Sequence, residues 1–217
     1  MDAKEDDQAD KQNIVTGTLL TIKRETGEGF VPAAISGRHI HLDQKTADCL
    51  FGTGYLFTRC KELSQPGQYA CEETVAVAGP KGTLTVRVLG PLRREAQIEI
   101  SITDASKSGV EPVVRMSGEL KGSPGARIIG PAGETTLQSG VIVAARHLHM
   151  SKAQADGYGL KNGDTVDLRS DGCRGIVFER VVVRSGMGHE LELHIDFDEA
   201  NCAQIKTGDL LKIVCSR

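Results

Sequence analysis

No stretch of the 217-residue sequence comes near the roughly 18 consecutive apolar residues that a membrane-spanning helix requires. A long run of lysine or arginine is also missing, and the formal net charge of −3 with a pI near 6.1 argues against a nucleic-acid binder. The first residues, Met1–Asp7, are acidic and therefore unlike a secretory signal. The six cysteines form no C-x-x-C pair, so we expect reduced thiols in the cytoplasm and no catalytic cysteine.

What the sequence does contain is a repeated histidine motif. Four of the six histidines lie in two phrases of the same form, GRHIHL at 37–42 and ARHLHM at 145–150. In a β-strand, residues i and i+2 point to the same face, so each phrase can direct two imidazoles at one ion while the apolar residue between them packs behind. The four candidate ligands are His39, His41, His147 and His149. The repetition favours metal binding over ordinary surface or core histidines.

A third ligand for each site follows from treating the chain as a duplication. Each half continues with an arginine-containing valine strand and then an alternating strand, at 96–101 in the first half and 191–196 in the second. Glu99 and His194 occupy matching places in these last strands. The result is a His/His/Glu set and a His/His/His set, whose nitrogen and oxygen donors suit zinc, with cobalt or manganese as alternatives. We therefore expect two divalent metal ions.

The expected secondary structure is mainly β. Short runs rich in valine and isoleucine are separated by Gly, Pro and Asp turns, and this spacing suits small β-barrels. Short helices are predicted at 43–50, 151–158 and 198–205, each close behind a predicted ligand strand. The chain is long enough for two cores of roughly a hundred residues each, and the pattern alone would divide it near Gly122.

Several separated motifs, in the same order, resemble those of the phosphate propanoyltransferases, a family of phosphotransacylases. The resemblance extends from about Val31 to Cys215 and includes SGRHIHL at 36–42, LSQPGQ at 63–68, VRVLGP at 86–91, QIEIS at 97–101, ARHLHM at 145–150 and HIDFDEAN at 194–201. It implies an acyltransferase that interconverts a short-chain acyl-CoA plus phosphate with acyl phosphate plus coenzyme A. The implied fold has two small β-barrel domains related by internal duplication, capped by short helices, with the active site between them.

The resemblance also implies roles for individual residues. By position it assigns His39, His41 and Glu99 to one ion, and His147, His149 and His194 to the other. The family's phosphate-binding arginine, which is the catalytic residue, falls on Arg93, and a nearby phosphate-binding serine falls on Ser117. Some relatives carry a cysteine ligand two residues after the glutamate; this chain has Ser101 there, so we expect that ion to keep a water or substrate oxygen. The implied reaction is direct attack of metal-bound phosphate on the thioester.

Interleaved barrels, a further implication of the resemblance, change the domain boundaries. Residues 28–37 join 145–215 in one barrel, residues 38–144 form the other, and residues 1–27 are an N-terminal extension. In relatives this extension is often an amphipathic helix that targets the enzyme to the lumen of a bacterial microcompartment, where shell proteins or enzymes are its partners. Here it contains a glycine and several β-branched residues without a clear helical period, so a surface strand or a partner-binding tail is an equal alternative. A homo-oligomer is a further expectation.

Two other functions stay open. A di-metal hydrolase acting on a thioester or phosphate ester would use the same ions to activate water, and it differs from a transferase in not needing phosphate. A non-catalytic module with structural zinc agrees less well with three-ligand sets, because structural sites are usually closed sets of four ligands rich in cysteine. Arg38 and Arg146, which precede the paired histidines, are expected either to support the strands by pairing with carboxylates or to contact phosphate.

Overall fold

The computed structural model describes residues 15–21, 23, 26 and 28–216, and these form a mainly β protein with short helices. The predicted fold class is confirmed: one sheet closes into a barrel, and the other is a curled sheet of nine strands. Contacts divide the chain into two units. The barrel unit comprises Arg146–Ile195 and Glu199–Arg217 with the chain up to Ile35, and the sheet unit comprises Ser36–Ala145 with Asp196–Asp198. Across the described ranges, no helix is long and apolar enough to cross a membrane.

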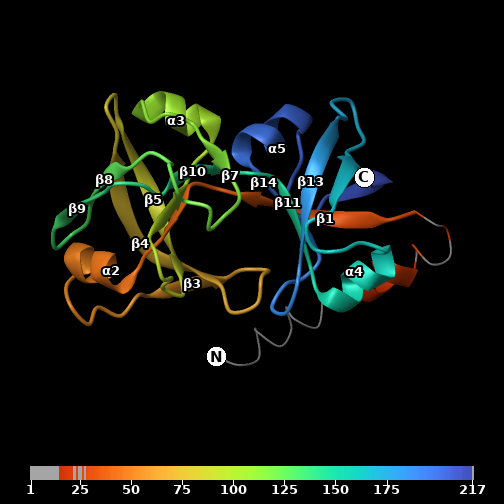
Figure 1. Cartoon of the computed structure of the whole chain (residues 1–217), viewed down its shortest axis with the longest axis horizontal. Coiled ribbons are helices and arrows are strands. Elements are labelled where there is room, and N and C mark those ends of the chain that lie inside the picture. Colours follow the sequence, from red (N-terminus) through yellow and green to blue (C-terminus); the bar gives the residue numbers. More distant parts are fainter. Residues whose placement is uncertain (1–14, 22, 24–25, 27, 217) are drawn as a thin grey trace. The chain divides into compact units, whose positions relative to one another are not determined.

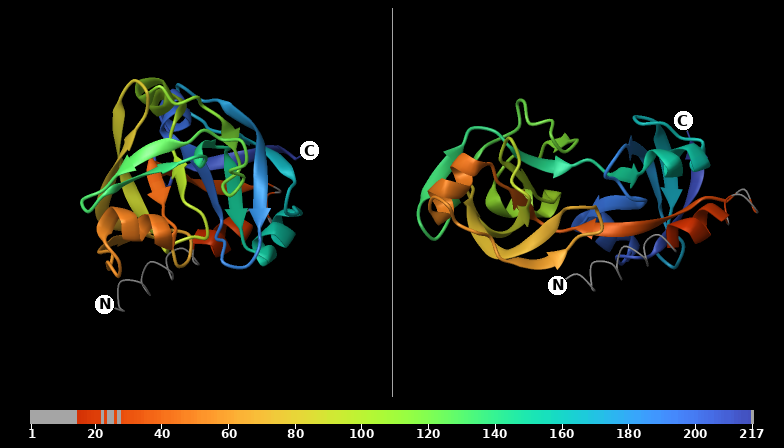
Figure 2. Two further views of the ribbon diagram at one scale, coloured as in Figure 1. Left: turned by 60° about the vertical axis from the view of Figure 1, so that its left-hand side comes forward. Right: turned by 90° about the horizontal axis from the view of Figure 1, so that it is seen from below.

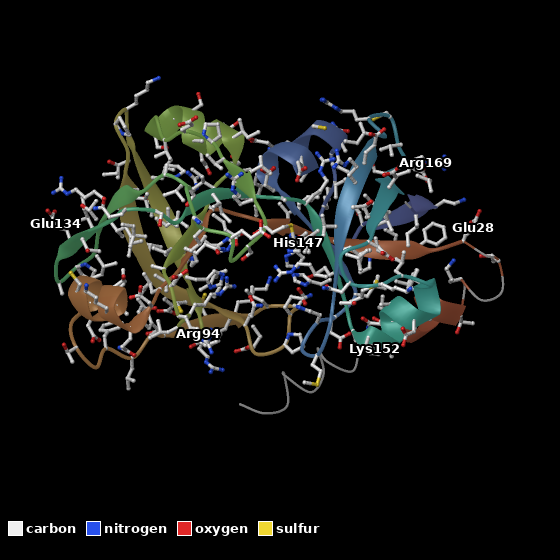
Figure 3. The ribbon with its side chains drawn as sticks, viewed as in Figure 1. Glu28, Arg94, Glu134, His147, Lys152 and Arg169 are labelled. Carbon is white, nitrogen blue, oxygen red and sulfur yellow. The ribbon has the colours of Figure 1, made fainter. Side chains whose placement is uncertain are left out.

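The barrel unit is built on a closed sheet with the strand order β1-β14-β11-β13-β12-β15 (Figure 1). The bounds are β1 Phe30–Ser36, β11 His147–Met150, β12 Thr165–Arg169, β13 Val177–Ser185, β14 Glu192–Asp196 and β15 Leu210–Ser216. Strand β1 pairs antiparallel with β15, so an N-terminal strand closes a barrel whose other strands come from the C-terminal half. Figure 2 shows this orange-red strand beside the blue C-terminal part of the chain. The charged side chains of Lys152 and Arg169, labelled in Figure 3, are exposed on this unit.

The sheet unit has the strand order β7-β10-β6-β2-β5-β4-β8-β9, with β3 paired to β4. The bounds are β2 His39–His41, β3 Arg59–Glu62, β4 Tyr69–Ala78, β5 Thr83–Gly90, β6 Gln97–Glu99, β7 Val114–Arg115, β8 Ala126–Ile129, β9 Glu134–Leu137 and β10 Val141–Ala144. The short strand β2 lies between β5, to which it is parallel, and β6, to which it is antiparallel. Both neighbours therefore hold β2 in register.

The apolar residue between each pair of histidines packs into a hydrophobic core. In β11 this residue is Leu148, which is fully buried and pairs with Leu193 of β14 and Val183 of β13. Ile40 holds the equivalent place in β2 and is fully buried in the core of the sheet unit. Burial of such a side chain is worth about 1.5–3 kcal/mol. Since alternate residues of a strand face opposite ways, this burial turns the flanking histidines to the other face.

Short helices follow the ligand strands. Their bounds are α2 Gln44–Phe51, α3 Ile102–Ser108, α4 Lys152–Tyr158 and α5 Phe197–Ala203. The side chain of Asp43 caps α2 by accepting a hydrogen bond from the backbone N–H of Thr46, and Ser151 forms a capping box with Gln154 at the start of α4. Helices α2 and α4 agree with the sequence prediction because these polar caps and the apolar pattern behind them are local signals, and α5 agrees with the helix predicted at 198–205.

Helix α3 corrects the prediction of a strand at 96–101. Strand β6 ends at Glu99, and Ser101 instead caps α3 by accepting a hydrogen bond from the backbone N–H of Asp104. The run of alternating apolar residues continues through Ile100, which is why the pattern suggested a longer strand.

The surface strand considered for the N-terminal extension is wrong for residues 15–21, which are helical. Leu19 in this segment is only 3% exposed and belongs to the hydrophobic core of the barrel unit. Burial of its apolar side chain therefore outweighs the weak helix propensity of the β-branched residues around it. Residues 1–14 lie outside the described part of the chain, so the predicted targeting role of the extension stays a prediction.

Candidate functional site

The first donor set lies in the sheet unit, on strands β2 and β6. The two strands are antiparallel, and their register places His39 opposite Glu99. His39, His41 and Glu99 are 7%, 2% and 8% exposed, and one candidate ligand atom from each lies within 4.8 Å of the others. The structure therefore brings together the three residues that the sequence predicted for one ion.

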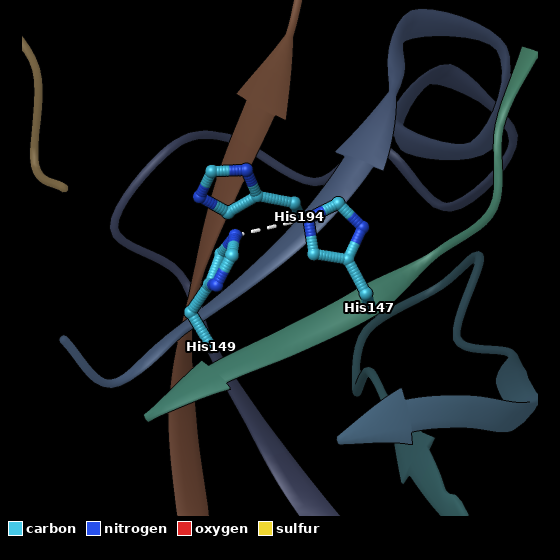
Figure 4. A group of neighbouring side chains, drawn as sticks. All are labelled: His147, His149 and His194. Atoms are coloured by element: carbon cyan, nitrogen blue, oxygen red, sulfur yellow. Dashed lines mark hydrogen bonds between the residues drawn. The ribbon is translucent and has the colours of Figure 1, made fainter. Parts of the chain in front are cut away.

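The second donor set lies in the barrel unit, on strands β11 and β14. These strands are also antiparallel and place His147 opposite His194, which is the relation that His39 has to Glu99. Candidate ligand atoms of His147, His149 and His194 lie within 4.8 Å of one another. Figure 4 shows the three rings converging, with the Nε2 atoms of His147 and His149 3.1 Å apart. The matching register is the structural reason why the duplication located a third donor in each half.

Burial holds one imidazole of each set in the neutral form. It lowers the pKa of His41 to about 2, with the neighbouring His39 and Arg93 as further causes. Burial likewise lowers the pKa of His149 far below its ordinary value, and the nearby His194 adds to the effect. A neutral imidazole is the form that coordinates a metal, because a protonated ring nitrogen has no lone pair to offer.

His39 differs because it faces a carboxylate. Burial by itself lowers the pKa of His39, but the charge and hydrogen bond of Glu99, with the Gly37 carbonyl, outweigh burial and leave the pKa raised. His39 Nδ1 lies 2.8 Å from the Gly37 carbonyl oxygen, and Nε2 lies 3.5 Å from Glu99 Oε2. The backbone contact at Nδ1 therefore directs Nε2 at the carboxylate, which is the arrangement that a metal ligand needs.

The donor chemistry of both sets fits a divalent metal. Imidazole nitrogens and a carboxylate are the ligands that zinc binds in catalytic sites, where three protein ligands leave a position for water or substrate. In the second set, the Nδ1 atom of His149 is buried and has no hydrogen-bond partner in the described part of the chain. Because this ring converges on the set through Nε2, 3.1 Å from His147 Nε2, an ion held by the set would lie at Nε2 and not at Nδ1, and the fit rests on the donor types and their spacing.

Arg93 and Ser117 lie together beside the first donor set. Arg93 Nη1 donates to Ser117 Oγ at 3.3 Å, and the backbone N–H of Arg93 donates to the Leu42 carbonyl, immediately after β2. Gln97 Nε2 donates to Ser117 Oγ at 2.8 Å and to Glu99 Oε1 at 2.5 Å. One chain of hydrogen bonds therefore connects the guanidinium to the donor carboxylate.

Three residues of the site were missed by the sequence reasoning: Gln97, Glu192 and His189. Glu192 Oε2 lies 2.8 Å from His194 Nε2, and the His189 ring stacks on the ring of His149 with centroids 4.4 Å apart. Gln97 and Glu192 could have been found, because each stands two residues before a predicted third donor and so shares its strand face. His189 follows a glycine-containing loop and had no such signal.

Arg38 and Arg146 pair with carboxylates, which was one of the two expectations for them. Arg38 Nη1 lies 3.1 Å from Asp104 Oδ1, and Arg146 Nε lies 2.7 Å from Glu199 Oε1. Each carboxylate follows the third donor of its own half by five residues. The first pair therefore connects the start of β2 to α3, and the second connects the start of β11 to α5.

The fold and these donor sets define a class of protein: a chain with one closed β-barrel and one curled β-sheet, each carrying a three-donor group suited to a divalent metal, the group of the curled sheet lying beside an arginine and a serine. Residues 32–206 match the family described as phosphate propanoyltransferase. The phosphate propanoyltransferase of Thermotoga maritima is 48% identical over 195 residues, which cover 89% of this chain and 91% of that protein.

Two further relatives carry the same name. The Rhodobacter capsulatus protein is 48% identical over 190 residues, covering 87% of this chain and 88% of its own length. The Clostridioides difficile protein is 42% identical over 202 residues, covering 93% of this chain and 95% of its own length. The chain therefore belongs to the phosphate propanoyltransferase family and is an acyltransferase.

Proposed function

We propose that the protein is a phosphate acyltransferase that interconverts a short-chain acyl-CoA plus phosphate with acyl phosphate plus coenzyme A. Family membership supports the reaction class. The observation that carries the proposal is the hydrogen-bonded chain from Arg93 through Ser117 and Gln97 to Glu99. Within the sheet unit, this chain of hydrogen bonds joins an arginine, a residue type that commonly binds phosphate, to a set of residues that could bind a metal ion.

The proposed cofactors are two divalent ions, zinc by the donor types. His39, His41 and Glu99 would hold one ion, and His147, His149 and His194 would hold the other. When bound, such ions would attract phosphate oxygens and polarise the thioester carbonyl, which offsets the negative charge of the phosphate and of the tetrahedral intermediate. The neutral state of His41 and His149 keeps nitrogen lone pairs available for this purpose.

Arg93 is the residue that the proposal assigns to phosphate. A guanidinium presents N–H groups in a planar fork that matches two phosphate oxygens, which a lysine ammonium does not. Ser117 Oγ already accepts hydrogen bonds from Arg93 and Gln97, so the hydroxyl hydrogen is the group it can offer to a phosphate oxygen. Both side chains would therefore orient the nucleophile as well as bind it.

The proposed chemistry uses no protein nucleophile. An oxygen of phosphate forms a bond to the carbonyl carbon, the carbon–sulfur bond breaks, and coenzyme A leaves with the electron pair as a thiolate. In the described part of the chain, five cysteines are free thiols, and none of them belongs to a donor set: Cys49, Cys60, Cys71, Cys173 and Cys202. Direct transfer is therefore proposed in preference to an acyl-cysteine intermediate.

The test follows thiol release from propanoyl-CoA with and without inorganic phosphate, before and after chelation and restoration with zinc. Phosphate-dependent release, lost on chelation and regained with zinc, is the expected result. Release at an undiminished rate without phosphate would instead support the di-metal hydrolase and reject the transferase. A panel of acetyl-, propanoyl- and butanoyl-CoA in the same assay identifies the preferred acyl chain.

Homo-oligomer formation and a microcompartment location stay predictions in this proposal. Fractionation of the native host tests the location, and light scattering of the purified chain tests the oligomeric state. Leu19 belongs to the hydrophobic core of the barrel unit, so the helical residues around it pack on their own unit.

A further inference from the structure

Two positions before each third donor, on the same strand, lies a second residue whose side chain is also buried. In β6 this neighbour of Glu99 is Gln97, which is 2% exposed, and in β14 the neighbour of His194 is Glu192, which is 5% exposed. The strand registers place Gln97 opposite the second histidine of its motif, and Glu192 occupies the same position in its own half. The duplication therefore includes a fourth position in each half, and that position holds different residue types.

The side chain of Gln97 is fixed in one orientation by three hydrogen bonds. Its amide nitrogen donates to Glu99 Oε1 at 2.5 Å and to Ser117 Oγ at 2.8 Å, and its amide oxygen accepts from the backbone N–H of Gly118 at 2.8 Å. Turning the amide over would put an oxygen against the carboxylate and a nitrogen against an N–H donor. The amide therefore acts as a rigid donor to one oxygen of Glu99, while the other oxygen faces His39.

In the barrel unit, the polarity of the contact is reversed. Glu192 Oε2 lies 2.8 Å from His194 Nε2, so a carboxylate oxygen faces an imidazole nitrogen. In the tautomer in which Nε2 donates this hydrogen bond, Nδ1 is the lone-pair atom. Ligating histidines in proteins characteristically donate their other ring N–H to a carboxylate, which fixes the ring and raises its basicity.

We infer that Gln97 and Glu192 are matched positioning residues for the third donors. A carboxylate donor needs a hydrogen-bond donor beside it, and an imidazole donor needs an acceptor, so the supporting residue changes from amide to carboxylate when the ligand changes from Glu99 to His194. Through Ser117, the amide of Gln97 also sets the position of Arg93 relative to the donor carboxylate. This inference rests on the proposed function, because it assumes that both sets bind metal.

Single substitutions give the first test, with cobalt(II) as the probe metal. Gln97→Glu and Glu192→Gln are each expected to weaken cobalt binding at one site by about 10- to 100-fold in competition with a chelator, and to change the visible spectrum of that site. The matched controls are Gln138→Glu in the sheet unit and Glu179→Gln in the barrel unit, because both residues are exposed. Thermal unfolding of the metal-free proteins shows whether each variant is folded.

An exchange of pairs gives the decisive test. Glu99→His alone places an imidazole beside a hydrogen-bond donor, and Gln97→Glu alone places two carboxylates together, so each single variant has a mismatched pair. The double variant with both changes recreates the Glu-x-His arrangement of β14 and is expected to bind cobalt at least about tenfold more tightly than either single variant. A merely structural role for Gln97 would not produce such a recovery.

The outcomes separate this inference from the proposed function. Uptake of no cobalt by the unmodified protein would overturn the proposed metal sites and the inference with them. If the unmodified protein binds two cobalt ions but the losses of cobalt affinity in Gln97→Glu and Glu99→His simply add in the double variant, the inference is wrong and the proposed metal sites remain. Complete loss of one ion in Glu192→Gln, with the metal-free fold intact, would make Glu192 a ligand and likewise reject its positioning role.

Discussion

Arg93 allows the sharpest test of the proposed chemistry, because it has an exposed arginine next to it. Arg93→Met removes the guanidinium but keeps a side chain of similar length, and Arg93→Lys keeps the charge but not the planar fork. The neighbouring Arg94 is exposed and points outward (Figure 3), whereas Arg93 is partly buried and hydrogen-bonds to Ser117. Arg94→Met and Arg94→Lys are therefore matched controls.

The magnitude follows from the hydrogen bonds that the fork can make. A hydrogen bond to a charged group contributes about 1.5–3 kcal/mol, and the partial exposure of Arg93 favours the lower end of that range. Loss of two such bonds in Arg93→Met therefore costs about 3 kcal/mol, which is roughly 150-fold in kcat/KM for phosphate. Arg93→Lys should lose about half of that free energy, roughly tenfold, because one directed bond remains.

The assay measures kcat and KM for phosphate and for propanoyl-CoA separately. The loss in Arg93→Met should appear with phosphate as the varied substrate, while KM for propanoyl-CoA changes little. Both Arg94 variants should retain the parent values. An unchanged kcat/KM for phosphate in Arg93→Met, or an equal loss in Arg94→Met, would refute the assignment of Arg93 to phosphate.

Three other predictions concern metal, thiol reactivity and stability. Glu99→Ala and His194→Ala should each lower the metal content by about one ion per chain in elemental analysis, and full retention in either would remove that residue from its site. Burial raises the pKa of the Cys71 thiol to about 11, so a thiol reagent at pH 8 should label exposed cysteines and spare Cys71; rapid labelling would contradict its burial. Arg38→Met leaves the buried carboxylate of Asp104 without its ion pair, and because Arg38 is 40% exposed we expect a loss of about 1–2 kcal/mol in urea unfolding; an unchanged midpoint would contradict a supporting role.

Local sequence signals were sufficient for the elements that carry the donor sets. The alternation around Ile40 and Leu148 predicted strands with histidines on one face, and burial of these two side chains is what holds that face in place. The caps at Asp43 and Ser151 predicted helices at the right residues. The strand predicted through Ser101 was too long because the alternation of apolar residues continues past the end of β6. Ser101 caps a helix instead, and the tertiary structure decides between these two possibilities.

Repetition within the chain predicted which residues would meet across strands. Glu99 and His194 lie far along the chain from their histidine pairs, yet a shared internal order was enough to match them. The reason is physical: with one face of each strand buried, a slip of one residue would expose the core, so equivalent sequences adopt equivalent registers.

The sequence by itself determined the mainly β class and the six candidate metal ligands, because these depend on strand periodicity and on an internal repeat, and it indicated the family through several separated motifs in the same order. Only the tertiary structure decided the contacts among Arg93, Gln97 and Ser117, and those between Glu192 and His194. Such hydrogen bonds depend on where a loop returns to a strand and on how a side chain is turned. Neither property has a signature in the spacing of residue types, because the loop that carries Ser117 is placed by packing and not by a repeating pattern.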